Sequence, residues 1–91
     1  MTTTKTEVEA KVKEIVASIA DFELEATAID SGKDGLKKLG LNSLALIRIM
    51  VEIEKEYEIE MNIDEENDYI MNSVCDLAEY ILSWESDNLG L

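Results

Sequence analysis

Apolar residues recur at helical spacing along most of this chain, and this periodicity restricts the fold more than any other feature. A first helix is predicted over residues 5–21, with its start fixed by the capping-box spacing of Thr4 and Glu7. Its expected inner face is Val8, Val12, Ile15, Val16 and Ile19. Similar patterns predict helices over residues 43–57 and 73–86, so we expect an all-α fold.

Glycines mark one long connection. Three of the four glycines lie between residues 32 and 40, and the chain has no proline. We therefore expect a long first loop over residues 22–42, with a short helical turn near residues 34–38. A loop of this length in a small domain is often functional. The expected anchors of this region on the core are Phe22, Leu24, Ile29, Leu36 and Leu39.

The stretch after the second helix gives a mixed signal. Residues 51–63 alternate apolar and mostly acidic side chains, with the period of two that is typical of a strand. Ile53 and Tyr57 also keep the helical phase, and Glu and Lys favour helix over strand. We therefore expect the helix to continue to Tyr57 and to be followed by extended chain through Met61.

The last third of the chain carries two further helix signals. Asp64 is predicted to cap a short third helix over residues 65–70, and Ser73 to cap the last helix. Trp84 is expected to pack over the last turn, and residues 87–91 to be frayed. The expected inner face of the last helix is Val74, Leu77, Ala78, Ile81 and Leu82.

Composition restricts the class of protein and its partners. The 91 residues, 46% of them hydrophobic, support a single domain over residues 1–91. A net charge of −13 argues against nucleic acid and favours partners with Lys and Arg patches. No apolar run approaches the roughly 20 residues of a membrane helix, so we expect a cytoplasmic protein with no membrane partner. The single cysteine, Cys75, excludes an internal disulfide, and buried packing is its expected role.

The sequence gives little support to catalysis or metal binding. It has no histidine, the commonest general base, and Ser43 lies outside a Gly-x-Ser-x-Gly motif. Residues 30–35 resemble the start of a calcium-binding loop, but Leu41 replaces the glutamate that such a loop needs at position 12. We expect no metal site, although weak cation binding to the acidic residues 52–68 stays open.

Ser43 follows a glycine-marked turn and opens the second helix. Gly40 tolerates the positive φ of a tight turn, and serine is a preferred N-cap. Helix N-termini also favour a nearby phosphate. The Ser43 hydroxyl is therefore either a cap or the attachment point of a phosphate-linked group. Three lysines lie nearby in sequence: Lys33, Lys37 and Lys38. They are either ordinary solvent-exposed loop residues or a source of positive charge beside a phosphodiester.

The second helix has two apolar stripes. The core stripe is Leu46, Ile49, Met50, Ile53 and Tyr57. The second apolar stripe, Leu44, Ile47 and Val51, lies on a different face and either packs against the long loop or docks a partner. The stripe alone favours burial, but together with the motif around Ser43 we expect Leu44 and Ile47 to be partly exposed. Residues 72–74 have the same Asn-Ser-apolar sequence pattern as residues 42–44, but no Gly-Leu precedes them. Ser73 is therefore interpreted as a cap only.

The segment Leu39–Tyr57, LGLNSLALIRIMVEIEKEY, resembles the prosthetic-group site and following helix of acyl and peptidyl carrier proteins. In that family, Gly-x-Asp-Ser-Leu opens the second helix of a small four-helix bundle. The matching positions are Gly40, Leu41, Ser43 and Leu44, and Asn42 stands where the family usually has aspartate. The resemblance implies an acyl-carrier-type four-helix bundle with a long first loop and a short third helix.

The resemblance also implies a function. Ser43 would carry covalent 4′-phosphopantetheine, transferred from coenzyme A by a phosphopantetheinyl transferase. The arm would hold acyl or aminoacyl groups as thioesters for loading enzymes and downstream synthases, and the chain itself would not catalyse. The expected partner-binding residues are Asn42, Leu44, Ile47, Arg48 and Val51. Because Asn42 removes a charge that helps the transferase in the family, we expect modification to be slower or limited to fewer transferases.

The subtype depends on weaker signals. Residues 45–48, ALIR, resemble peptidyl carriers, whereas the acidity and short length resemble free-standing acyl carriers. We expect a discrete, monomeric peptidyl or aminoacyl carrier of a specialised pathway. A fatty-acid or polyketide acyl carrier is the alternative. A non-carrier helical adaptor that binds a partner helix through residues 44–51 is a more distant one.

Overall fold

Three α-helices and three short 3₁₀ segments form the part of the chain that the structure describes. This computed structural model describes residues 4–20, 23–63 and 68–89, with side chains as far as Trp84. The elements in chain order are α1 (Lys5–Ile19), η1 (Ala26–Ala28), η2 (Lys37–Leu39), α2 (Ser43–Tyr57), η3 (Asp68–Asn72) and α3 (Val74–Leu89). The predicted all-α class is confirmed, since these ranges contain no strand. A four-helix count is not confirmed, because a 3₁₀ segment stands where the short third helix was expected.

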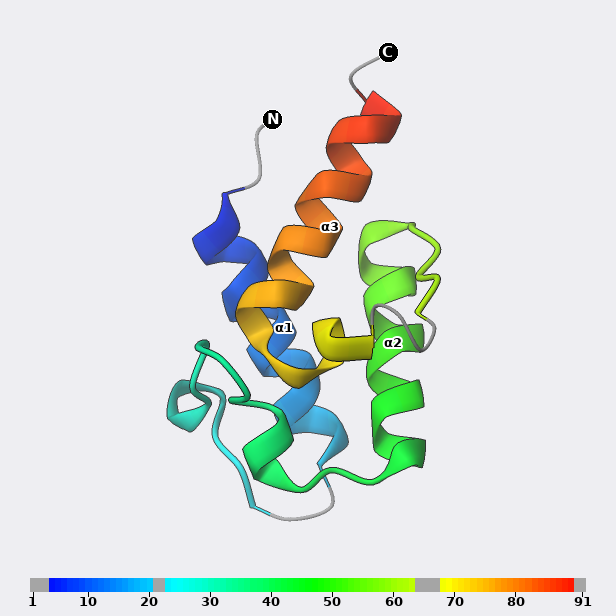
Figure 1. The fold of residues 1–91 in the computed structure, drawn as a ribbon. Helices are drawn as coiled ribbons and strands as arrows, with labels where there is room; N and C mark the ends of the chain where they lie inside the picture. The colour runs from blue at the N-terminus through cyan, green and yellow to red at the C-terminus, as the bar shows by residue number, and fades with distance from the viewer. Residues whose placement is uncertain (1–3, 21–22, 64–67, 90–91) are drawn as a thin grey trace.

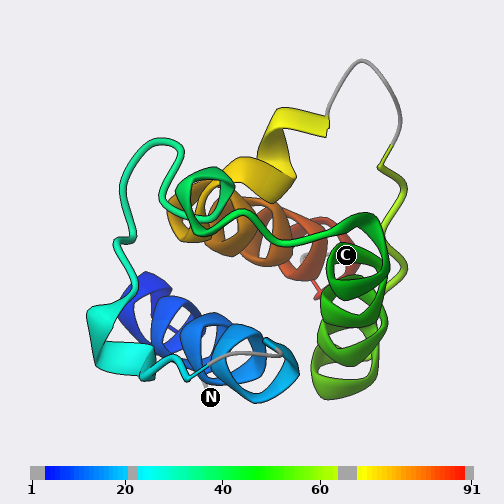
Figure 2. The same ribbon diagram turned by 90° about the horizontal axis from the view of Figure 1, so that it is seen from below.

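The helix α1 packs against both other helices. It lies beside α3, and α2 packs on it from another side (Figure 1). The connection from α1 to α2 runs along one side of the three helices before it reaches the start of α2 (Figure 2). Within the described ranges, no helix is long and apolar enough to cross a membrane.

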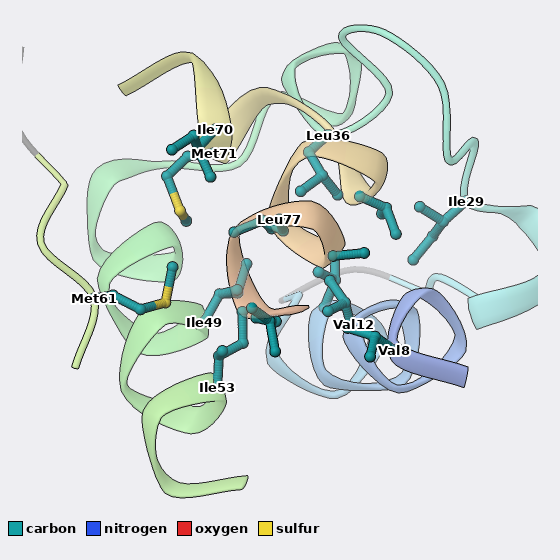
Figure 3. Close-up of a cluster of buried hydrophobic side chains, with 14 of the residues drawn as sticks. Val8, Val12, Ile29, Leu36, Ile49, Ile53, Met61, Ile70, Met71 and Leu77 are labelled. Atoms are coloured by element: carbon teal, nitrogen blue, oxygen red, sulfur yellow. The ribbon is translucent and has the colours of Figure 1, made fainter. Parts of the chain in front are cut away.

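The hydrophobic core lies where the three helices meet η3 and the connection. Figure 3 shows Val8 and Val12 of α1, Ile49 and Ile53 of α2 and Leu77 of α3 turned toward one another. All five are fully buried, so replacing either isoleucine or Leu77 with alanine should cost about 2–5 kcal/mol. The predicted core stripes are therefore confirmed. Their outer members are partly buried against the same core: Ile15, Leu46, Met50, Tyr57 and Leu82. Trp84, which was not part of a predicted stripe, is partly buried there as well.

Most helix ends agree with the sequence, with small differences. The Glu7 N–H donates to Thr4 Oγ1 at 3.2 Å, which confirms the predicted cap of α1. The helix ends at Ile19 rather than at residue 21, and the expected core residue Phe22 lies outside the described residues. The prediction of a frayed end is wrong for residues 87–89, because α3 continues to Leu89.

The expected short helix falls partly outside the described residues. Asp64, its predicted cap, and residues 65–67 belong to that undescribed part. From Asp68 the chain forms η3, which reaches Asn72 with Ile70 and Met71 buried. The observed segment is 3₁₀ rather than α, and it turns the chain directly into α3.

The connection before α2 is fixed to the start of α3 by backbone hydrogen bonds. The Leu36 N–H donates to the Asn72 carbonyl at 2.9 Å, and the Cys75 N–H donates to the Ser31 carbonyl at 3.0 Å. The predicted anchors Ile29 and Leu36 are buried. Gly35 is required here because a Cβ would lie 2.1 Å from the Asp30 carbonyl oxygen. Residues 29–36 of the connection are thus packed and hydrogen-bonded onto the helices.

The mixed signal after α2 is explained by a sharp turn at Glu58. This residue adopts a left-handed conformation with φ of 54°, and the Ile59 N–H donates to the Glu54 carbonyl at 3.2 Å. The Glu54 carboxylate then accepts from the Met61 N–H at 3.0 Å. Ile59 and Met61 are both buried, so the alternation reflects an extended segment packed on the core, as predicted.

Cys75 differs from its expected role. Its side chain is half-buried rather than fully buried. The pKa of Lys5 is raised above its ordinary value by hydrogen bonds with the Cys75 thiol and the Glu79 carboxylate. Lys5 Nζ lies 3.0 Å from Glu79 Oε1. These contacts connect the first turn of α1 to α3.

Candidate functional site

The turn before α2 has the geometry that the glycine predicted. Gly40 ends η2 with φ of 69° and ψ of 31°, in the left-handed region that L side chains rarely adopt. A Cβ at this position would meet nothing within 4 Å. Backbone conformation rather than lack of space therefore favours glycine here, and the turn directs the chain into α2.

Asn42, and not Ser43, is the N-cap of α2. The Asn42 Oδ1 accepts a hydrogen bond from the Ala45 N–H at 2.8 Å, and Ser43 is the first residue of the helix. Of the two roles that the sequence left open for Ser43, that of helix cap is therefore wrong. Among the described residues, the exposed Ser43 hydroxyl has no hydrogen-bond partner. Because the Asn42 side chain provides the cap of α2, the Ser43 hydroxyl is not used as a cap and is available for chemistry.

The second apolar stripe is exposed, as expected. The exposed fractions are 65% for Leu44, 56% for Ile47 and 40% for Val51. Arg48 is exposed beside them. Three apolar side chains in successive turns of one helix face, open to solvent, are characteristic of a surface that another protein covers.

An open groove of about 550 Å³ lies next to Ser43. Its lining joins η2, the first two turns of α2, and η3, and consists of Lys37, Ser43, Leu46, Ile47, Met50, Asp68, Met71 and Asn72. Of the three lysines singled out in the sequence, only Lys37 lines this groove. The contributions of Asp68, Met71 and Asn72 were not predicted, because no local signal indicates that η3 lies opposite the start of α2.

The charge around Ser43 is opposite in sign to that of the whole chain. Residues 35–51 contain no acidic residue and three basic ones, Lys37, Lys38 and Arg48. The rest of the chain therefore holds all 21 acids and five of the eight bases. A negatively charged group at Ser43 would thus lie in the most favourable electrostatic part of the sequence.

The structure also bears on the calcium-loop resemblance of residues 30–35 and on the role of Ser73. The calcium-loop residue Asp30 uses its Oδ1 to accept from the Gly32 N–H at 2.8 Å, which stabilises a local turn. Within the described ranges, no group of three His, Cys, Asp or Glu side chains could hold a metal ion. Ser73 caps α3 as predicted: its Oγ accepts from the Asp76 N–H at 3.0 Å and donates to Asp76 Oδ2 at 2.8 Å.

The structure thus combines a helical domain, an exposed serine at a helix start and an exposed apolar stripe on the same helix, an arrangement that is compatible with a carrier-type protein. Residues 10–81 match the family described as the phosphopantetheine attachment site. The chain is also 35% identical over 71 residues to the acyl carrier protein of Clostridium acetobutylicum, a match that covers 78% of this chain and 87% of that protein. The chain therefore belongs to the phosphopantetheine-binding family of carrier proteins, whose cofactor is attached covalently. No solved structure matches the chain.

The residues around Ser43 fit a phosphate-linked arm. The serine oxygen is exposed and unpaired within the described part of the chain, and the charged residues nearest to it along the sequence are basic, although Asp68 also lines the groove. The groove offers apolar side chains from Leu46, Met50 and Met71 next to the polar Asn72. This combination suits an arm that carries a phosphodiester at one end and continues as a mostly uncharged chain.

Proposed function

We propose that Ser43 Oγ is the attachment point of 4′-phosphopantetheine and that residues 1–91 act as one non-catalytic carrier domain. The observation that carries this proposal is the exposed Ser43 hydroxyl, which is left without a partner in the described structure because Asn42 caps α2. When bound, the group supplies a thiol that holds an acyl or aminoacyl group as a thioester. The chain's own role is to hold the arm and to present it to enzymes.

Attachment requires a phosphopantetheinyl transferase. Ser43 Oγ forms a bond to the phosphorus that carries the pantetheine arm, the pyrophosphate bond of coenzyme A breaks, and adenosine bisphosphate leaves. The serine proton passes to the transferase or to solvent. The chain supplies no base for this step, since no titratable side chain hydrogen-bonds to the Ser43 hydroxyl within the described residues. Activation of the serine is therefore assigned to the transferase.

The second apolar stripe is proposed as the docking surface for the transferase and for the loading and synthase enzymes. Leu44, Ile47 and Val51 are exposed on the helix that begins with Ser43, so a protein bound to them is next to the arm. Arg48 and Asn42 lie at the same end of α2. The −13 net charge favours enzymes with basic surfaces and makes docking weaker as salt rises. Tethering then raises the effective concentration of the cargo at the docked active site.

The proposed subtype is a discrete peptidyl or aminoacyl carrier of a specialised pathway, in the cytoplasm and monomeric. The sequence of residues 45–48, ALIR, resembles peptidyl carriers and supports this subtype. A fatty-acid or polyketide acyl carrier is the second candidate, and the similarity to a protein named acyl carrier protein does not separate the two subtypes. Loading of the modified protein by aminoacyl-activating and malonyl-transferring enzymes separates the two. Robust malonyl loading without aminoacyl loading would contradict the proposed subtype.

The attachment itself is tested by intact mass. Wild-type protein incubated with coenzyme A and a broad-specificity transferase should gain one phosphopantetheinyl group, and Ser43→Ala should gain none. Peptide mapping should place the group on the peptide with Ser43 and leave the peptide with Ser73 unmodified. An unmodified wild-type protein would contradict the carrier function and favour an adaptor that binds through residues 44–51.

A further inference from the structure

We propose that Lys37 binds the phosphodiester formed at Ser43 and so positions the start of the arm along the groove between α2 and η3. This inference rests on the proposed attachment at Ser43. It assigns to Lys37 a role that neither Lys38 nor Lys33 shares, although all three lie close to Ser43 in sequence.

Lys37 is the lysine that the structure places with Ser43. Both residues line the same groove, and the side chain of Lys37 is exposed, so its ammonium group is hydrated and can change rotamer. Lys5, Lys11 and Lys55 are engaged in ion pairs with glutamates. Lys37 forms no ion pair with any described residue, so an anion at Ser43 would not have to displace an existing partner.

The acidic side chain in the groove strengthens this assignment. Asp68 of η3 also lines the groove, and it is not within ion-pair distance of Lys37. A phosphodiester at Ser43 is attracted by Lys37 and repelled by Asp68. The phosphate is therefore expected on the η2 side of the groove, and the remainder of the arm can pass over Met50 and Met71.

The first turn of α2 supports the same position. The Asn42 side chain accepts a hydrogen bond from the Ala45 N–H. The other backbone amides at this end of α2 carry the partial positive charge of a helix start. The helix has 15 residues, and Ser43 is the first of them. The helix end attracts the phosphate without giving it a direction within the groove. Lys37 supplies that direction, because it lies on one side only.

The expected size of the effect is modest. An exposed ion pair changes an equilibrium by about two- to fivefold. We therefore expect loss of Lys37 to reduce, and not to abolish, the fraction of time that the arm lies along the groove. Salt should weaken the same contact, since exposed charges are screened.

The test compares four versions of the phosphopantetheine-modified protein: wild type, Lys37→Met, Lys38→Met as the matched control, and Lys37→Arg as the conservative variant. Intact mass first confirms that each carries the group. Amide spectra of the apo and modified forms then report which residues sense the arm, and phosphorus NMR reports the surroundings of the phosphodiester. Wild type, Lys38→Met and Lys37→Arg should shift the Met50, Met71 and Asn72 amides, with a salt-dependent phosphorus signal.

Lys37→Met should show smaller shifts and a weaker salt dependence than the other three proteins while it remains fully modified. If Lys37→Met and Lys38→Met give the same amide and phosphorus spectra, the inference is wrong. Failure of the wild-type protein to accept the group would instead contradict the proposed function. The two failures are therefore distinguishable. Because Lys37 is exposed and makes no described ion pair, its replacement should leave the apo fold intact.

Discussion

Two helix starts in this protein have almost the same sequence and opposite roles. Asn42-Ser43-Leu44 opens α2, and Asn72-Ser73-Val74 opens α3. At α2 the asparagine is the cap, and the serine is the first residue of the helix, with its side chain exposed to solvent. At α3 the serine is the cap and is 1% exposed. A shift of one residue in the helix start therefore decides whether the hydroxyl stabilises the fold or is available to other molecules.

The difference follows from the residue three positions after each serine. Asp76 follows Ser73 at the capping-box position, and the two side chains hydrogen-bond to each other at 2.8 Å. Leu46 occupies the equivalent position after Ser43 and offers no polar partner. Asn42 instead reaches the Ala45 N–H. A serine near a helix start is thus best interpreted together with the side chains that compete with it for the cap.

The residue after each serine gives the largest expected contrast. Val74 is fully buried, whereas Leu44 is 65% exposed. Val74→Ala should lower the free energy of unfolding by about 2–3 kcal/mol, because it removes buried methyl groups and leaves a cavity. Leu44→Ala should change it by less than about 0.5 kcal/mol. Urea unfolding followed by circular dichroism measures both. Equal losses would show that the two helix starts are packed alike.

The serines themselves give the next contrast. Ser73→Ala should lower the free energy of unfolding by about 1–2 kcal/mol, because it removes a cap and leaves the part-buried Asp76 without its partner. The same change at Ser43 should cost less than about 0.5 kcal/mol. Thermal unfolding of the two variants side by side tests this. A larger loss for Ser43→Ala would mean that its hydroxyl caps α2 after all.

The cap of α2 can be removed separately. Asn42→Ala should lower the free energy of unfolding by about 1 kcal/mol, because the Ala45 N–H loses its acceptor. Asn72→Ala is the matched control. Asn72 contributes its backbone carbonyl to Leu36, and that carbonyl is retained in alanine. A smaller effect of Asn42→Ala than of Asn72→Ala in the same unfolding assay would contradict the assignment of the cap.

The smallest expected stability change comes from Asn42→Asp. Aspartate keeps the capping oxygen and adds a negative charge at a helix N-terminus, which should stabilise α2 by about 0.3–1 kcal/mol. In addition, the variant should be modified faster by the transferase, since it restores the residue that the family usually has. Initial rates measured by intact mass test the second effect. A slower Asn42→Asp protein would contradict it.

Local patterns in the sequence predicted the helices well. Periodicity placed α2 at residues 43–57, and capping signals placed the starts of α1 and α3. The exposure of Leu44 and Ile47 was predicted only with the help of the motif around Ser43, because periodicity alone favours burial of a second apolar stripe. These features depend on residues within a turn or two of each other, and such interactions can be interpreted without the fold.

Features that depend on distant segments were not predicted. The sequence does not indicate that η3 faces the start of α2, so Asp68, Met71 and Asn72 were not expected beside Ser43. The sequence left open whether Ser43 caps α2, because Asn42 and Ser43 are both good caps and only the backbone decides between them. The short helix expected over residues 65–70 is described only from Asp68 onward, where the structure has the 3₁₀ segment η3.

The pair of amide hydrogen bonds between the connection and the η3–α3 corner has a mechanical consequence. Leu36 and Cys75 tie residues 31–36 to the segment that forms one wall of the groove. Any widening that moves η3 away from α2 must either carry this part of the connection along or break those two bonds. The exchange rates of these two amide protons with deuterated solvent would therefore register the opening of the groove.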